Sequence, residues 1–162
     1  MTGTDLARMY ELSYGAIKRN LEDLTHAESV VTPSNGGNCL NWVLGHIVLT
    51  RNTILRLAGG TAPSIGEDLA VYRRGSTPCG ADGYLDLATL RGYLDDSQQL
   101  ILPALAAMSE KAIASPVPEP LNKPPLNGSV GEALGRLSFH EAYHTGQLGL
   151  LRRLAGKEGA IR

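Results

Sequence analysis

The sequence predicts an all-α protein: a four-helix bundle with a long crossover between the second and third helices. Four separate segments repeat apolar residues at intervals of three and four, the spacing of one helix face. No run of residues reads as a strand. The second connection is long enough to carry the chain back along a bundle, and the first is short. A chain of 162 residues suits one domain, which we assign to residues 1–162.

The first predicted helix covers about residues 5–27. Thr2 or Thr4 can cap its start, and the turn-rich run 32–37 follows its end. His26 would then lie in the last turn, where a cation interacts favourably with the helix dipole. The apolar stripe consists of Leu6, Tyr10, Ile17, Leu21 and Leu24.

The second predicted helix covers residues 39–58. Asn38 is its expected N-cap, and Gly59 with Gly60 supplies the left-handed residue that ends many helices. Apolar residues surround most of its circumference, so we expect the most buried helix of the bundle or a helix at a subunit interface.

The third predicted helix covers residues 86–108, and Pro103 should kink it or end it early. Before it, residues 59–85 form a connection of unusual length, which often indicates a functional segment. After it, the Pro-rich residues 115–128 predict extended chain on the surface.

The fourth predicted helix covers residues 130–155. Ser129 and Glu132 form the S-x-x-E pattern of a capping box, and Gly156 follows the helix.

Charge and composition exclude several kinds of partner. The net charge is −1 and no run of Lys and Arg occurs, so we expect no nucleic-acid partner. No stretch of about 20 apolar residues predicts a membrane span, and the first residues lack the pattern of a signal peptide. Cys39 and Cys79 form no CxxC pair, which favours a reducing cytoplasm.

The fourth helix contains the clearest chemical signal, His140 and His144. Residues four apart project from one helix face, so two imidazoles can bind one metal ion. Both lie on the apolar side of this helix. Two core histidines with polar partners on other helices are an equally good interpretation of this pair alone. The sequence also matches H-E-x-x-H, but a zinc protease would need a sheet beside the helix.

His46 is the third inward-facing histidine, on the apolar stripe of the second helix. Together the three can supply a three-nitrogen site with open positions, as catalytic metals have. Gln147 and Asn41 are candidates to orient the imidazoles. Glu141 is a weak candidate for a catalytic base, and a solvated or supporting role is the favoured alternative. Cys39 is expected to be a small core residue.

Two segments resemble the DinB/YfiT-like superfamily of metal-dependent enzymes. They are Leu40-Asn41-Trp42-Val43-Leu44-Gly45-His46-Ile47 and, some ninety residues later, Phe139-His140-Glu141-Ala142-Tyr143-His144-Thr145-Gly146-Gln147-Leu148. The resemblance implies a down-up-up-down bundle, frequent homodimers and a divalent metal on His46, His140 and His144. Zinc or nickel is favoured, with manganese or iron as further options.

The resemblance also implies a reaction class. Members with assigned chemistry include transferases and isomerases that use low-molecular-weight thiols. We therefore expect an enzyme acting on a small molecule, first by thiol-dependent S-transfer and second by hydrolysis with a metal-bound water. The connection 59–85, with Tyr72, Arg73 and Arg74, can cover the open end of the site and contact an anionic thiol cosubstrate; for the two arginines a solvated loop is the favoured alternative. The competing hypothesis is a non-enzymatic metal-binding or stress-related interaction protein.

Overall fold

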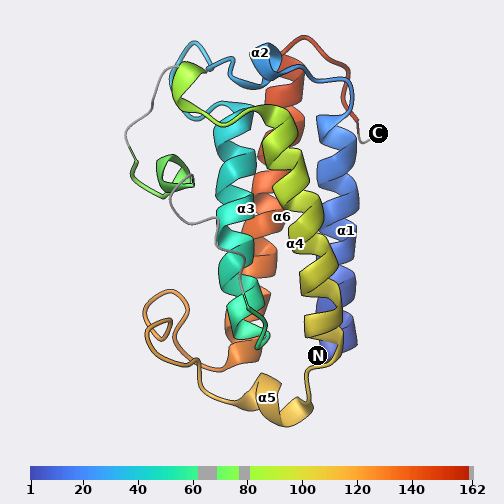
Figure 1. Ribbon diagram of the computed structural model, residues 1–162, viewed down its shortest axis with the longest axis vertical. Coiled ribbons are helices and arrows are strands. Elements are labelled where there is room, and N and C mark those ends of the chain that lie inside the picture. The colour runs from blue at the N-terminus through green and yellow to red at the C-terminus, as the bar shows by residue number, and fades with distance from the viewer. Residues whose placement is uncertain (62–68, 77–80, 161–162) are drawn as a thin grey trace.

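The computed structural model describes residues 1–61, 69–76 and 81–160. Within these ranges the regular structure is helical, apart from one isolated bridge between Pro116 and Ser129. Four long helices form the bundle: α1 (Gly3–Leu21), α3 (Leu40–Leu57), α4 (Leu87–Ala106) and α6 (Val130–Leu154). The all-α prediction is confirmed (Figure 1).

The crossover is also confirmed. α1 packs mainly against α4 and α6, and α3 packs against the same two helices, so α1 and α3 lie diagonally across the bundle. In Figure 1, α1 and α6 run upward while α3 and α4 run downward. The connection between α3 and α4 therefore returns the chain to the top, and its described parts include the short helices η1 (Ala70–Tyr72) and η2 (Ala81–Gly83).

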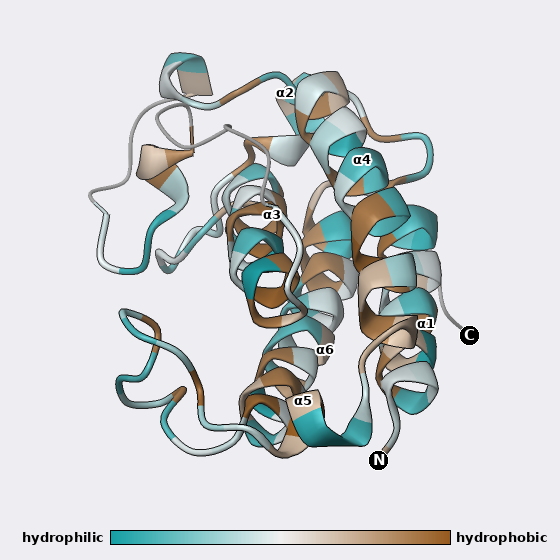
Figure 2. Cartoon of the chain, turned by 60° about the horizontal axis from the view of Figure 1, so that its bottom comes forward, coloured by the Kyte–Doolittle hydropathy of each residue, from teal (hydrophilic) through white to brown (hydrophobic). Residues whose placement is uncertain are grey.

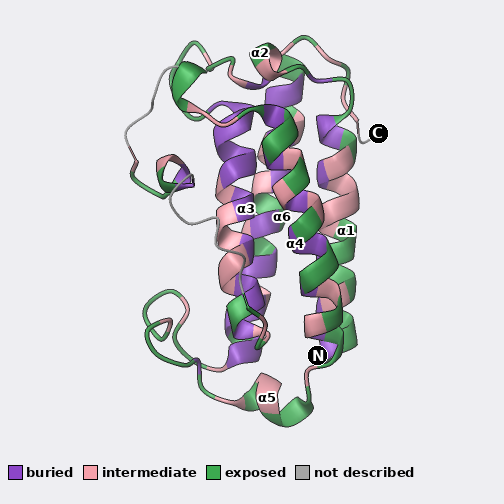
Figure 3. Ribbon diagram, in the orientation of Figure 1, coloured by how far each residue is buried: buried purple, intermediate pink, exposed green. Residues whose placement is uncertain are grey.

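The core fills the space between the four helices in two clusters, one toward each end of the bundle. Leu44 of α3 and Leu94 of α4 are fully buried in one, and Leu6 of α1 and Leu134 of α6 in the other. Burying a leucine side chain stabilises the fold by about 1.5–3 kcal/mol. Apolar residues line the inner faces of the long helices, and α3 is buried over most of its circumference, as predicted (Figures 2 and 3).

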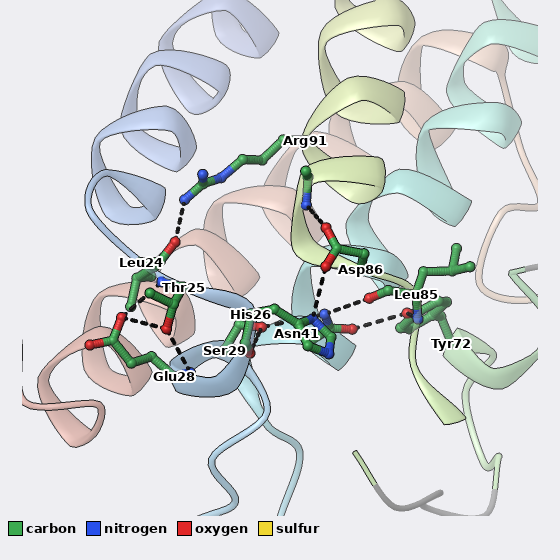
Figure 4. Close-up of polar contacts among 11 residues, drawn as sticks. Leu24, Thr25, His26, Glu28, Ser29, Asn41, Tyr72, Leu85, Asp86 and Arg91 are labelled. Carbon is green, nitrogen blue, oxygen red and sulfur yellow. Dashed lines mark hydrogen bonds and ion pairs between the residues drawn. The ribbon is translucent and has the colours of Figure 1, made fainter. Parts of the chain in front are cut away.

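The first predicted helix is in fact two helices. α1 ends at Leu21, Asp23 takes a left-handed conformation with φ 56°, and α2 (His26–Ser29) follows. Thr25 and Glu28 form a capping box that starts α2, because each side chain bonds the backbone N–H of the other (Figure 4). His26 therefore lies at a helix start, and the predicted role at a helix end is wrong.

The predicted start of α3 and the predicted early end of α4 at Pro103 differ from the structure. Cys39, not Asn38, occupies the N-cap position of α3, and it makes no capping hydrogen bond with its side chain. Gly59 has φ 80°, which confirms the left-handed residue after α3. α4 continues three residues past Pro103, so the predicted early end there is wrong. Pro103 is exposed, and its ring causes no clash within the core.

The Pro-rich residues 115–128 fold back on themselves and are not extended. The N–H of Val117 donates to the carbonyl of Gly128, and the N–H of Val130 donates to that of Ser115. These bonds close a loop between α5 (Glu110–Ala114) and α6. The predicted capping box of Ser129 and Glu132 is present at the start of α6.

No helix in the described ranges has the length and apolarity to cross a bilayer. Cys79, with residues 62–68 and 77–80 of the predicted 59–85 connection, lies outside the described residues. Cys39 is buried with a free thiol, which agrees with its prediction as a small core residue.

Candidate metal centre

Three histidines from two helices meet half-way along the bundle. Nε2 of His46 on α3 lies 3.2 Å from Nε2 of His140 on α6. Nε2 of His144, one turn further along α6, lies 3.1 Å from the same atom of His140. The three rings offer ligand atoms that all lie within 4.8 Å of one another. We call His46, His140 and His144 the histidine cluster.

Two of the three rings are held by their outer nitrogens. Nδ1 of His46 lies 2.8 Å from the carbonyl oxygen of Tyr72, and Nδ1 of His144 lies 2.6 Å from Oε1 of Gln147. Both oxygens can only accept, so both Nδ1 atoms carry the proton and donate. The Nε2 atoms of His46 and His144 are then unprotonated, and both face Nε2 of His140.

This arrangement fits a cation better than a hydrogen-bonded core. His140 can donate one proton from Nε2, and that proton satisfies one of two neighbouring lone pairs. Nδ1 of His140 is buried and has no hydrogen-bond partner among the described residues. The alternative of core histidines bonded to Ser, Asn or Gln of other helices is not what the structure shows, because the partners are Tyr72, Gln147 on α6 itself, and one another.

The surroundings keep the cluster uncharged at neutral pH. Burial, with smaller contributions from the neighbouring His144 and His46, lowers the pKa of His140 to about 4. Burial also lowers the pKa of His46 and of His144, although the hydrogen bonds to Tyr72 and Gln147 oppose this. Neutral imidazoles have the lone pairs that a metal ion requires.

α3 presents His46 through a set of tight contacts with the crossover. The indole of Trp42 stacks on His46 with ring centroids 4.9 Å apart, and its N–H donates to the carbonyl of Val71 at 3.0 Å. Gly45 lies against the ring of Tyr72, where an added Cβ would come within 2.3 Å. Glycine is therefore required for the approach that brings the Tyr72 carbonyl to His46.

Asn41 supports the cluster indirectly. Its amide donates to the carbonyl of Leu85 at 2.9 Å and accepts from the hydroxyl of Tyr72 at 3.0 Å (Figure 4). The same hydroxyl accepts from the N–H of Leu85 at 2.8 Å. Asn41 thus fixes Tyr72, whose carbonyl orients His46; direct contact with an imidazole, as predicted, is not seen. Gln147 does make its predicted contact.

A family model described as the DinB superfamily matches residues 9–148, which is most of the chain. The chain belongs to the DinB superfamily. A solved structure, that of a conserved protein from Enterococcus faecalis, is similar with a TM-score of 0.73 and 16% identity. The match covers 97% of this chain and 99% of that one, and it shows a shared fold. No curated protein matches the chain.

In this DinB superfamily chain, Glu141 lies inside the bundle. Its side chain is 2% exposed, so of the favoured alternative, a solvated or supporting role, the solvated half is wrong. Both carboxylate oxygens accept from the guanidinium of Arg51, Oε2 from Nε at 2.9 Å and Oε1 from Nη2 at 2.8 Å. Among the described residues, the group that could hold a metal ion consists of the three histidines, and no carboxylate belongs to it.

Sequence reasoning missed several residues that matter here. Arg51 was detectable as a charge in the middle of a largely apolar helix, whose other charge, Arg56, lies in the last turn; Arg51 is fully buried. The Tyr72 carbonyl leaves no signal in a sequence, because every residue has one. Arg74, in contrast, was predicted as a candidate contact for a thiol cosubstrate; it is exposed, and its positive charge contributes to lowering the pKa of His46.

The protease alternative finds no support in the fold. The H-E-x-x-H pattern needs its Glu beside the metal as a base, whereas Glu141 is paired with Arg51. The described residues also contain no strand that could bind an extended peptide.

Proposed function

We propose that this chain is a metal-dependent enzyme that binds a divalent ion through Nε2 of His46, His140 and His144 and acts on a small molecule. The convergence of the three Nε2 atoms carries the proposal. Three protein nitrogens leave at least one coordination position open, as catalytic sites have. Imidazole ligands suit zinc and nickel, and also iron, while manganese prefers oxygen ligands.

Thiol-dependent S-transfer is the reaction class that we favour. An ion with an open position holds a low-molecular-weight thiol as its nucleophilic thiolate near neutral pH. Among the described residues, no carboxylate joins the cluster as a general base for an attacking water, and this favours the thiol over hydrolysis as the first choice. In this proposal His46, His140 and His144 bind the metal ion, while Tyr72 orients the ring of His46 and Gln147 that of His144.

The proposal extends to a homodimer in the cytoplasm. The outer side of α6 exposes four large apolar side chains over four turns: Phe139, Tyr143, Leu150 and Leu154. Apolar patches of this kind on a helix commonly mark protein interfaces. The buried free thiol of Cys39 is compatible with a reducing compartment, where thiol cosubstrates are kept reduced.

Metal content tests the core of the proposal. Protein purified without an immobilised-metal column should contain about one zinc or nickel ion per chain by elemental analysis. His46→Ala and His140→Ala should each lose most of it. Protein that neither carries nor takes up a divalent ion would overturn the proposal.

Turnover tests the reaction class. A panel of small thiols with a chlorinated arene should show metal-dependent S-transfer that the chelated protein lacks. A metal-loaded protein that turns over none of the thiols would favour the non-enzymatic binding protein, and metal-dependent hydrolysis of an ester or amide would favour the second reaction class.

A further inference from the structure

Arg51 and Glu141 form an ion pair in the middle of the bundle. The side chains are 0% and 2% exposed, and two parallel hydrogen bonds join them. Replacing such a buried pair by apolar residues of similar size is often neutral or stabilising, because the desolvation of two charges offsets their attraction. Stability alone is therefore a poor explanation for this pair.

The pair joins the two helices that carry the histidine cluster. Arg51 follows His46 by five residues on α3, about 7.5 Å along the helix axis at 1.5 Å per residue. Glu141 directly follows His140 on α6. The separation of the Nε2 atoms of His46 and His140 therefore depends on how α3 is placed along and around α6, close to this pair.

Apolar contacts between α3 and α6 do not fix that placement finely. The hydrophobic effect has no direction, and leucine and isoleucine side chains can repack after small shifts. A guanidinium held by a carboxylate at two points has a defined distance and plane. A shift of about an ångström would break one of its two hydrogen bonds at 2.8 and 2.9 Å.

Both partners are themselves held in place. Nη1 of Arg51 donates to Oε1 of Gln98 at 2.9 Å and to Oγ of Ser97 at 3.3 Å, both on α4. The ring of Tyr14 on α1 lies 5.8 Å from the guanidinium carbon. Residues of all four long helices thus meet at Arg51, and the guanidinium is a fixed point in the bundle.

We propose that the Arg51–Glu141 pair sets the position of α3 against α6 and thereby holds Nε2 of His46 at binding distance from those of His140 and His144. Arg51 and Glu141 are positioning residues, acting through the helices and not on the substrate. This inference rests on the proposed metal site, and it assigns the pair to metal affinity and geometry instead of fold stability.

Cobalt(II) is the probe, because its visible spectrum reports ligand geometry. The double variant Arg51→Met/Glu141→Leu removes both charges and keeps similar volume. We expect it to fold with a melting temperature within a few degrees of the wild type, because the loss of two buried charges offsets the loss of the donor to Gln98, yet to bind Co²⁺ about tenfold or more weakly, with an altered spectrum. The control is Lys18→Met, which removes a half-exposed ion pair of 2.9 Å between α1 and α4 and leaves the hydrogen bond from Tyr14 to Asp95 in place. It should keep wild-type Co²⁺ affinity and spectrum.

Arg51→Lys keeps the charge and removes the two-point fork. It should also weaken Co²⁺ binding, and it provides the readout if the double variant does not fold. Wild-type affinity and spectrum in the folded variants would overturn the positioning role alone. A wild-type chain that binds no Co²⁺ would overturn the metal site, and the positioning role with it.

Discussion

Nε2 of His46 and Nε2 of His140 lie 3.2 Å apart across the α3–α6 contact, although 94 positions separate the two residues in the sequence. Their outer nitrogens differ. Nδ1 of His46 donates to a carbonyl, whereas Nδ1 of His140 is buried without a partner among the described residues. A hydrogen bond at Nδ1 therefore orients the ring of His46 on α3, whereas no such bond orients the ring of His140 on α6.

Acid should destabilise the metal-free protein through His140. The pKa of His140 is about 4 in the fold and about 6.5 in an unfolded chain. Between these values the unfolded chain binds the proton and the folded chain does not. The contribution of neutral His140 to the free energy of unfolding is therefore fully present above pH 6.5 and is lost as the pH drops toward 4. Melting temperatures of the chelated protein from pH 7 to pH 4 should show this fall.

The matching control for acid sensitivity is His140→Gln, whose side chain does not titrate. Its melting temperature should decline less over the same pH range. Equal slopes for the variant and the wild type would contradict the assignment of the pH dependence to His140.

Gly45→Ala should damage both the fold and the cluster. Its Cβ would come within 2.3 Å of the Tyr72 ring, so Tyr72 must move and its carbonyl must leave His46. We expect a loss of about 1–3 kcal/mol in the free energy of unfolding, as overpacking costs, together with weaker metal binding. Denaturant titration and Co²⁺ titration measure the two effects.

Gly92→Ala is the control for Gly45→Ala. Gly92 also lies within a helix, α4, but an added Cβ there meets nothing within 4 Å. The change should stabilise the chain by up to about 1 kcal/mol, the difference in helix propensity, and leave Co²⁺ affinity unchanged. If both glycine variants behaved alike, the contact with Tyr72 would not be the cause.

Gln147→Leu should weaken metal binding while the fold persists. It removes the oxygen 2.6 Å from Nδ1 of His144, so this ring loses the acceptor that orients it. Loss of such a partner typically reduces metal affinity by about 10–100-fold. Gln147→Glu retains an acceptor oxygen and should bind metal more tightly than Gln147→Leu. Competition with a coloured chelator measures both, and equal affinities would argue against an orienting role.

Phe139→Glu should convert the proposed homodimer into a monomer. The side chain is 75% exposed on the outer face of α6, where an added charge is solvated in a monomer and buried in an interface. Light scattering after size exclusion gives the mass. Leu100→Glu, at a 42% exposed residue on α4, is the control and should leave the mass unchanged. A wild-type mass of one chain would refute the dimer.

Hydrophobic periodicity was sufficient to predict the four long helices and the crossover, because the buried stripes of α1, α3 and α4 follow the helix repeat. It overran the end of α1, because Leu24 continues the apolar stripe. The break at Asp23 and the capping box of Thr25 and Glu28 are local events that a stripe does not record. Similarly, Pro103 lacks the backbone N–H that a helix residue donates, but it lies on the exposed face of α4, and the helix continues past it.

The histidines of the candidate site were identifiable from their spacing and inward direction, which depend on one helix at a time. The pairing of Arg51 with Glu141 was not, because it depends on how two helices 90 positions apart are placed against each other. Glu141 lies near the edge of the apolar arc of α6, so a helical wheel alone does not tell whether it is buried or exposed. Its burial depends on its partner Arg51, whose position is known only once α3 is placed against α6.

The acceptor for His46 is a main-chain oxygen of Tyr72, and this has a consequence for genetics. No point substitution at position 72 deletes that oxygen, although loss of the buried Tyr72 side chain can move it, so alanine scanning of the exposed crossover residues will understate the importance of this segment to the site. The crossover can exchange its exposed side chains, Arg73 and Arg74 among them, while the histidine keeps its orientation. In the proposed enzyme, substrate preference can therefore diverge in this segment while the candidate metal site is kept, and shortening the crossover by one residue would be more revealing than exchanging its exposed side chains.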